Sequence, residues 1–119
     1  MYGIMKRWRL IDYPDSVKFK KVNPFIYKKI TDFRQMPIDQ QKVFKEVKHF
    51  VCKILGETKC YAFGSRVNGN WLPESDYDIL IYSNPSKEIK LIILRKDFKV
   101  KVDIRYSVGA LISNMIEII

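Results

Sequence analysis

The chain has 119 residues, of which 47% are hydrophobic and 29% charged, and a formal net charge of +9. This length suits one domain with a real core and excludes a core plus a second folded domain. The composition excludes a disordered or fibrous chain, and no apolar run approaches the roughly 18 residues of a membrane span. Because no secretory signal opens the chain, we expect a cytoplasmic protein without membrane contact.

Basic residues are concentrated in the N-terminal third. Residues 1–38 carry nine Lys/Arg against three Asp, a net +6, and residues 39–119 carry thirteen against ten, a net +3. Such an excess favours a polyanionic partner, such as nucleotide phosphate, RNA, DNA or an acidic protein, although solubility alone would also explain it. We therefore expect residues 1–38 to be a basic extension packed on a domain formed by residues 39–119.

The first elements can be placed in chain order. Partial alternation within residues 1–22 predicts a short hairpin. Asn23-Pro24 is a helix-start signal, and it predicts a short helix that ends at Pro37. A longer helix is predicted over residues 39–55, where apolar residues form one continuous stripe before Gly56. The stripe, which we expect to pack on a sheet, consists of Val43, Phe44, Val47, Phe50, Val51, Ile54 and Leu55.

Residues 60–83 carry the residues of chemical interest. A short apolar strand over 61–63 stops at Gly64-Ser65, and a polar, turn-rich connection leads to Asp76-Tyr77-Asp78 and a second apolar strand. Gly64 lets the backbone come close to a phosphate, and Ser65 supplies a hydroxyl and an N–H at the start of a turn. Alternation along a strand directs Asp76 and Asp78 to the same face. Two adjacent carboxylates repel unless a cation lies between them, and oxygen ligands of this kind suit Mg²⁺.

Three further elements complete the prediction. Residues 87–96 are expected to form a helix, with a strand over residues 91–94 as the alternative. Residues 98–106 are expected to form a strand whose alternation puts Asp103, Lys101 and Arg105 on a polar face. Residues 108–119 space six apolar side chains along one side of a predicted helix. That stripe predicts a contact with a second copy or another protein through Leu111, Met115 or Ile119, or else a helix wholly absorbed into its own domain.

The motif at these residues resembles that of the minimal nucleotidyltransferases, within the DNA polymerase β-like superfamily. That pattern is Gly-Ser, a loop often containing glycine, Ser-Asp-x-Asp on a strand, and a third Asp on a later strand. Gly64, Ser65, Gly69, Ser75, Asp76 and Asp78 match it, and Asp103 is the candidate for the third carboxylate. The resemblance covers about residues 40–107. It implies an α/β (α+β) fold with helices packed on a small mixed sheet.

The resemblance also implies an activity and a set of roles. The activity is transfer of a nucleoside monophosphate from an NTP, expected to be ATP, to a hydroxyl. Asp76, Asp78 and Asp103 are implied as the catalytic ligands of two Mg²⁺ ions, with Mn²⁺ as the alternative, and Gly64, Ser65 and Arg66 as nucleotide-binding residues. For Arg66 an exposed position on a helix is the competing interpretation, and Lys101 and Arg105 are further candidates for phosphate.

The acceptor separates three hypotheses. The first is modification of a protein, as by the antitoxins that adenylylate a helical toxin. The second is a catalytically silent binding module that neutralises a partner. The third is nucleotide transfer to RNA or DNA ends, which the charge of +9 favours. A domain that does none of these, with Gly64-Ser65 as a mere helix cap and solvated aspartates, is the remaining interpretation.

Overall fold

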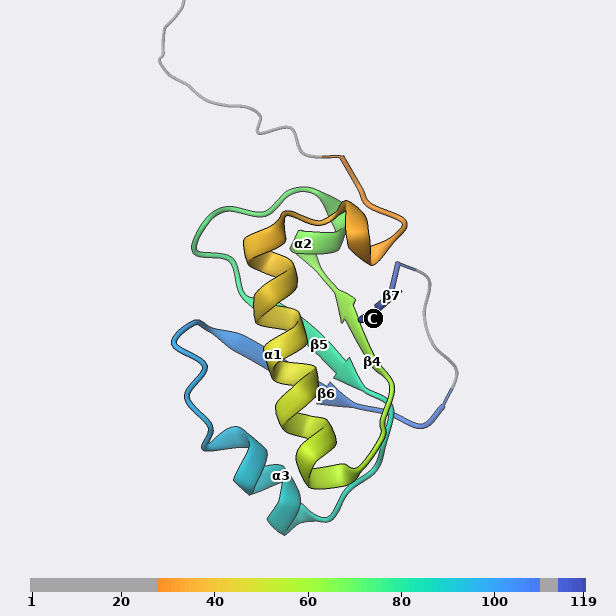
Figure 1. Cartoon of the computed structure of the whole chain (residues 1–119), viewed down its shortest axis with the longest axis vertical. Helices are drawn as coiled ribbons and strands as arrows, with labels where there is room; N and C mark the ends of the chain where they lie inside the picture. Colours follow the sequence, from red (N-terminus) through yellow and green to blue (C-terminus); the bar gives the residue numbers. More distant parts are fainter. Residues whose placement is uncertain (1–27, 110–113) are drawn as a thin grey trace, which may run out of the picture.

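The computed structural model describes residues 28–109 and 114–119. Figure 1 shows the elements in this order, beginning with the short 3₁₀ helix η1: η1 (Phe33–Gln35), α1 (Ile38–Leu55), β4 (Cys60–Phe63), α2 (Ser65–Asn68), β5 (Tyr77–Ile81), α3 (Lys87–Leu94), β6 (Val102–Tyr106) and β7 (Ile116–Glu117). The predicted hairpin within residues 1–22 and the helix-start signal at Asn23-Pro24 lie outside the described residues.

The strands form a four-stranded mixed sheet in the order β6-β5-β4-β7. β4 is antiparallel to both β5 and β7, whereas β5 and β6 are parallel and are joined through α3. A parallel pair needs such a crossover, and α3 is a compact one. The predicted small mixed sheet with packed helices is therefore confirmed, and the predicted third strand begins at Val102 rather than at 98.

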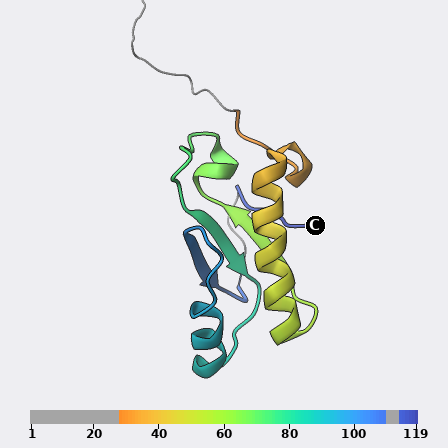
Figure 2. The same cartoon turned by 60° about the vertical axis from the view of Figure 1, so that its left-hand side comes forward.

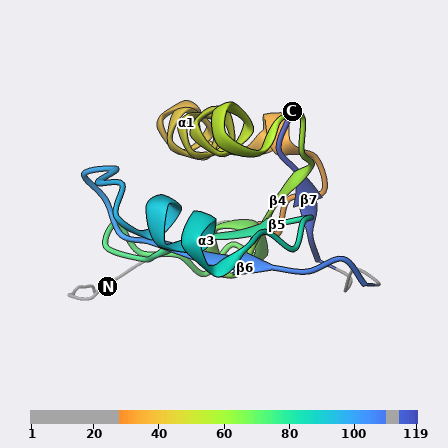
Figure 3. The same cartoon turned by 90° about the horizontal axis from the view of Figure 1, so that it is seen from below.

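The core lies between α1 and one face of the sheet (Figures 2 and 3). Phe44, Val47 and Val51 of α1 are fully buried, as are Ile79 and Ile81 of β5. Each such side chain contributes about 1.5–3 kcal/mol relative to an exposed one. Apolar residues recur about every 3.6 residues along α1 and every 2 residues along β5. Both spacings therefore place the apolar side chains at one interface.

The outer face of α1 is polar, with exposed Lys42, Glu46, His49 and Lys53. This amphipathic pattern is the one expected of a helix that covers a sheet. Across residues 28–109 and 114–119, no helix combines the length and the hydropathy needed to cross a membrane.

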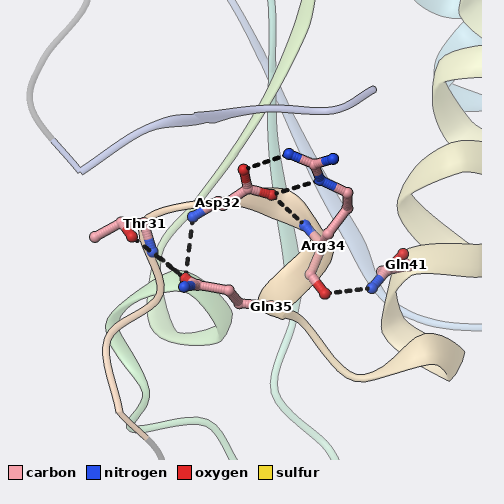
Figure 4. A network of polar contacts seen from close by, with 5 residues as sticks. All are labelled: Thr31, Asp32, Arg34, Gln35 and Gln41. Carbon is pink, nitrogen blue, oxygen red and sulfur yellow. Dashed lines mark hydrogen bonds and ion pairs between the residues drawn. The ribbon is translucent and has the colours of Figure 1, made fainter.

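The helix predicted before Pro37 is wrong in its described part, where the only helical turn is η1. The Asp32 carboxylate accepts from Arg34 N at 2.8 Å, and Gln35 Oε1 accepts from Thr31 N and Asp32 N at 2.7 and 3.2 Å (Figure 4). Gln41 Nε2 also donates to Arg34 O at 3.2 Å. These hydrogen bonds cap the turn at Asp32, only five residues before Pro37. Because proline interrupts a helix, a longer helix cannot form between the two residues.

The described end of the predicted basic extension is part of the core. Ile30 N donates to Val67 O at 3.0 Å, which ties the chain to α2. Phe33 and Met36 are 1% and 2% exposed, and the Phe33 ring meets Phe44 edge-on at 6.3 Å. Long-range packing therefore holds residues 30–36 in place without a regular helix.

The helix predicted over residues 108–119 is also wrong in its described part, residues 108–109 and 114–119. Ile116–Glu117 is a strand, β7, which pairs with Tyr61 and Ala62 of β4, and Ile118 N continues the pairing with a bond to Cys60 O at 2.9 Å. Ile116 and Ile118 are buried, whereas Ile119 is 57% exposed. The alternation of a strand explains this pattern better than helical spacing, because β4 offers an open edge for pairing. Of the predicted contact residues, Leu111 lies outside the described residues.

Candidate active site

Asp78 and Asp103 lie side by side across the two parallel strands. The register pairs Asp78 of β5 with Asp103 of β6, and Phe63 of β4 with Asp78 on the other side. Paired residues of neighbouring strands share a face of the sheet. The neighbours of Asp78 along β5, Tyr77 and Ile79, are buried on the α1 side. The two carboxylates therefore lie on the face that is turned away from α1.

The third carboxylate, Asp76, lies close enough to act on Asp78. Burial raises the pKa of Asp78, and repulsion by the Asp103 and Asp76 carboxylates raises it further, while Arg105 opposes the shift. A hydrogen bond between the Asp78 and Asp103 carboxyl groups, which requires a proton on one of them, acts in the same direction. Asp103 and Asp76 therefore both lie near Asp78.

Two of these carboxylates have a basic partner. Lys101 Nζ lies 3.6 Å from Asp76 Oδ1, and Arg105 donates to Asp103 Oδ2 at 3.2 Å. The carboxylates are 36% and 38% exposed and the basic side chains 79% and 65%, so these are surface ion pairs. Residues 28–109 and 114–119 contain no group of three His, Cys, Asp or Glu residues that could hold a metal ion.

Gly64 brings the predicted phosphate turn directly against Asp78. Its φ is +80°, a conformation that side chains rarely adopt. A Cβ at Gly64 would lie 2.0 Å from Asp78 Oδ2 and 2.9 Å from its Cγ. Only glycine therefore fits between β4 and this carboxylate. The same residue caps α2, because Gly64 O accepts from Val67 N and Asn68 N at 3.1 and 3.0 Å.

Ser65 follows as the first residue of α2 and is half-buried. The helix is one turn long and ends at Gly69, whose N–H donates to Ser65 O at 2.8 Å and whose φ is +93°. The tight turn keeps Ser65 beside Gly64, which touches Asp78. The Gly-Ser pair and the carboxylates predicted from the sequence thus form one continuous site.

Arg66 lies at the centre of the adjoining loop rather than on the surface. It is 3% exposed, and its guanidinium stacks on the Tyr77 ring at 3.9 Å. One terminal nitrogen donates to Ser75 O at 2.7 Å and Pro73 O at 3.2 Å. The exposed helix position considered for Arg66 is therefore wrong. The guanidinium instead ties α2 to the loop that carries Ser75 and leads into Asp76.

Tyr77 connects this arrangement to the core. Its ring lies between the Arg66 guanidinium and the Phe44 ring of α1, which it meets edge-on at 5.2 Å. Ser75 Oγ accepts from Leu72 N at 2.8 Å, which closes the loop just before the strand. The main chain before Asp76 is therefore held by hydrogen bonds to Ser75, and Tyr77 after it is buried, so we infer that Arg66 positions the site from behind.

Replacing Arg66 with methionine is expected to lower the free energy of unfolding by about 2–4 kcal/mol. The change removes charged hydrogen bonds to the Pro73 and Ser75 carbonyls, worth about 1.5–3 kcal/mol each. Urea denaturation measures the loss. Arg34→Met is the control, because the Arg34 side chain is 75% exposed and its ion pair with Asp32 is screened by solvent. Equal losses for the two variants would contradict the structural role of Arg66.

The raised pKa of Asp78 predicts a pH-dependent stability of the metal-free protein. The folded chain holds the Asp78 proton more tightly than the unfolded chain, so this group stabilises the fold at low pH. That contribution is lost as the pH rises from the ordinary Asp value of about 4 through the folded pKa. In EDTA, Asp78→Asn is therefore expected to gain stability over the parent protein as the pH rises from about 4 to 7. Urea denaturation across this pH range measures the free energy of unfolding of both proteins. A difference between the two that did not change with pH would contradict the prediction.

Sequence reasoning missed the basic partners of two of the three carboxylates. Lys101 and Arg105 were expected to face substrate phosphate, and the structure pairs them with Asp76 and Asp103. Part of this was readable, because Asp103 and Arg105 are two residues apart on one face of a strand. No local pattern shows that Arg66 turns inward, since its partners are the carbonyls of a loop six to nine residues away.

One protein family matches the chain. The family model described as "Nucleotidyltransferase domain" matches residues 44–116, which is more than half of the 119 residues. The match begins within α1 and includes the Gly64-Ser65 turn and all three carboxylates. No curated protein matches the chain.

Proposed function

The chain belongs to the nucleotidyltransferase domain family, and from this premise we propose that it transfers a nucleoside monophosphate from an NTP to a hydroxyl group. The acceptor oxygen attacks the α-phosphorus, the bond to the bridging oxygen of the β-phosphate breaks, and pyrophosphate leaves. The hydroxyl proton passes to a carboxylate, for which Asp103 is the candidate. The nucleotide is expected to be ATP.

The observation that carries the proposal is the convergence of Asp76, Asp78 and Asp103. Three oxygen-only ligands that repel one another, one with a raised pKa, are the donors that suit two Mg²⁺ ions, or Mn²⁺ in their place. When bound in such sites, divalent ions stabilise the attacking and leaving oxygens of the displacement. The role of the carboxylates is then to bind and orient these ions, and Asp78 is the one on which the other two act.

The ion pairs of Lys101 and Arg105 are compatible with this role. Exposed pairs contribute only about 0.2–1 kcal/mol each, so Asp76 and Asp103 can exchange their basic partners for a cation at little cost. Lys101 and Arg105 would then be released beside the site, where a triphosphate brings negative charge. The Gly64-Ser65 turn supports binding of the same triphosphate through its backbone and hydroxyl group.

Two acceptor classes fit the proposal. A protein acceptor, such as the toxin partner of an antitoxin, is the first, and RNA or DNA ends are favoured only by the net charge of +9. A catalytically silent module that neutralises a partner is a second function, and the ion-paired carboxylates together with the absence of a preformed metal group in the described residues favour it.

The test is incubation of the purified protein with each of the four NTPs, labelled at the α- or the γ-phosphate, with Mg²⁺ and a lysate of its own source. Nucleotidyl transfer is expected to leave the α-label, and not the γ-label, on an acceptor. Sensitivity of the product to protease or to nuclease separates the two acceptor classes. Transfer of the γ-label instead would overturn the proposal.

The silent module predicts a different result. It would give no labelled product with any NTP, and calorimetry would detect no NTP binding that depends on Mg²⁺. If NTP bound but no transfer occurred, the chain would still have a nucleotide-binding site. The molecules in that lysate would then be excluded as acceptors. The two functions are therefore distinguished by binding and transfer measured on the same preparation.

A further inference from the structure

β6 is the terminal strand of the sheet, and its outer edge is open within the described residues. Lys101 O accepts from Tyr77 N at 2.9 Å, and Ser107 N donates to Ile81 O at 3.1 Å. Alternate residues of a strand direct their backbone groups to opposite sides. The N–H and C=O groups of the intervening Val102, Ile104 and Tyr106 therefore point outward, where another strand could pair with them.

A pocket of about 330 Å³ adjoins this edge, between α3 and β6. Its apolar lining includes Ile93, Leu94, Phe98, Val100, Ile104 and Tyr106. Leu94 is 76% exposed and Val100 43% exposed, and Leu91 and Ile92 of α3 are 41% and 51% exposed. Contiguous apolar surface of this kind on one helix and one strand edge marks a contact site.

The rim of this surface is basic. Residues 87–105 contain seven Lys/Arg and three Asp/Glu, a net +4, and all seven basic residues except Lys90 are classed as exposed. Lys90 lies over the Tyr106 ring at 5.0 Å and Lys96 over the Phe98 ring at 5.9 Å, so both ammonium groups lie near the lining of the pocket. A second copy would bring two such rims together and is disfavoured by like-charge repulsion.

We propose that the surface formed by α3, the pocket and the outer edge of β6 binds an extended, acidic segment of another protein by strand addition. Main-chain hydrogen bonds to Val102, Ile104 and Tyr106 supply affinity, and the pocket takes apolar side chains from alternate positions of the segment. Asp or Glu residues between them meet Lys96 and the other basic residues of the rim. This surface adjoins the carboxylate site, because Asp103 is among the residues that line the pocket. Binding of the segment does not depend on nucleotidyl transfer.

The probe is a blocked decapeptide of alternating glutamate and valine, titrated into the ¹⁵N-labelled protein. Saturable binding is expected, with slowed hydrogen exchange at the amides of Val102, Ile104 and Tyr106. A glutamate–proline decapeptide carries the same charge but cannot donate within a ladder, and it is expected not to bind. A lysine–valine decapeptide tests the charge, and a ten-residue oligothymidylate tests a nucleic-acid partner.

Two exposed residues test the surface itself. Leu94→Ser and Lys96→Glu are each expected to weaken binding by roughly tenfold, which corresponds to about 1.4 kcal/mol. The matched controls lie on α1: Ile38→Ser, at a residue that is 65% exposed, and Lys42→Glu, at an exposed lysine. Neither control is expected to change the affinity. Unchanged amide spectra away from β6 show that the variants remain folded.

Several results would overturn the proposal. These are no binding of the glutamate–valine peptide, equal binding of the lysine–valine or glutamate–proline peptide, tighter binding of the oligonucleotide at β6, or protection at amides outside β6. A dimer that forms through β6 in sedimentation and is lost in Leu94→Ser would assign the surface to a second copy instead. None of these measurements requires NTP or activity, so they fail or succeed independently of the proposed transfer.

Discussion

Gly64→Ala is expected to lower the free energy of unfolding by about 2–4 kcal/mol. The new Cβ would lie 2.0 Å from Asp78 Oδ2, and the backbone φ of +80° is strained for any side chain. The Asp78 carboxylate would have to move away from Asp103, so binding of Mg²⁺ and NTP is expected to be lost in the protein that remains folded. Urea denaturation and calorimetry measure the two effects.

The matched control is Gly56→Ala. Gly56 has a similar φ of +86°, but a Cβ there would meet nothing within 4 Å. This variant therefore reports the backbone strain alone, about 1–3 kcal/mol, and is expected to leave NTP binding unchanged. The difference between the two glycines isolates the collision with Asp78.

A double-mutant cycle attributes that difference to Asp78. In an Asp78→Ala background, Oδ2 and Cγ are gone, and Gly64→Ala is expected to cost about 1–2 kcal/mol less than in the parent chain. If the losses of stability from the two substitutions were additive, the collision would be relieved by movement of a group other than Asp78. The contact between the phosphate turn and the carboxylate would then not be what requires glycine.

Asp78→Asn is expected to reduce nucleotidyl transfer by more than about 100-fold, since even the loss of an outer-shell partner of a metal ligand costs about 10- to 100-fold. Asparagine keeps the shape of the side chain but removes the charge that Asp103 and Asp76 repel. The fold is expected to persist, and the metal-free protein to be more stable at neutral pH, because the repulsion is gone. The α-labelled NTP assay measures the loss.

The control for this substitution is Asp97→Asn. The Asp97 side chain is 76% exposed and pairs with Lys99 at 3.9 Å in the loop before β6. The same chemical change there is expected to leave transfer unchanged. If Asp78→Asn retained the activity of the parent protein, the carboxylates would have no part in catalysis, whatever the family of the chain.

Most of the site was predictable because its parts are local in the sequence. The Gly64-Ser65 turn and the two aspartates of Asp76-Tyr77-Asp78 were read from short runs bounded by glycine or turn residues. Asp103 was assigned to the polar face of its strand by alternation, and the register with Asp78 agrees with this. Strand alternation depends only on the backbone, so it can be read before any tertiary contact is known.

The mistaken elements have a different physical origin. Residues 114–119 have a helix-like spacing, but the open edge of β4 captures them as β7, with Ile118 fully buried. The conformation of the segment before Pro37 is likewise set by its hydrogen bond to α2 and by its packing on Phe44. In short segments, intrinsic helix propensity contributes little, and long-range pairing and burial outweigh it.

The sequence by itself determined the helix α1, the strands β4, β5 and β6, and the residue types of the site, and it left residues 91–94 of α3 open between helix and strand. Only the tertiary structure decided that Asp78 touches Gly64, that Lys101 and Arg105 neutralise Asp76 and Asp103, and that Arg66 is buried on Tyr77. Periodicity depends only on residues that are close together in the sequence, so it can be read from the sequence alone. Contacts between side chains on different elements depend on the register and the packing of the whole sheet, which no local pattern specifies.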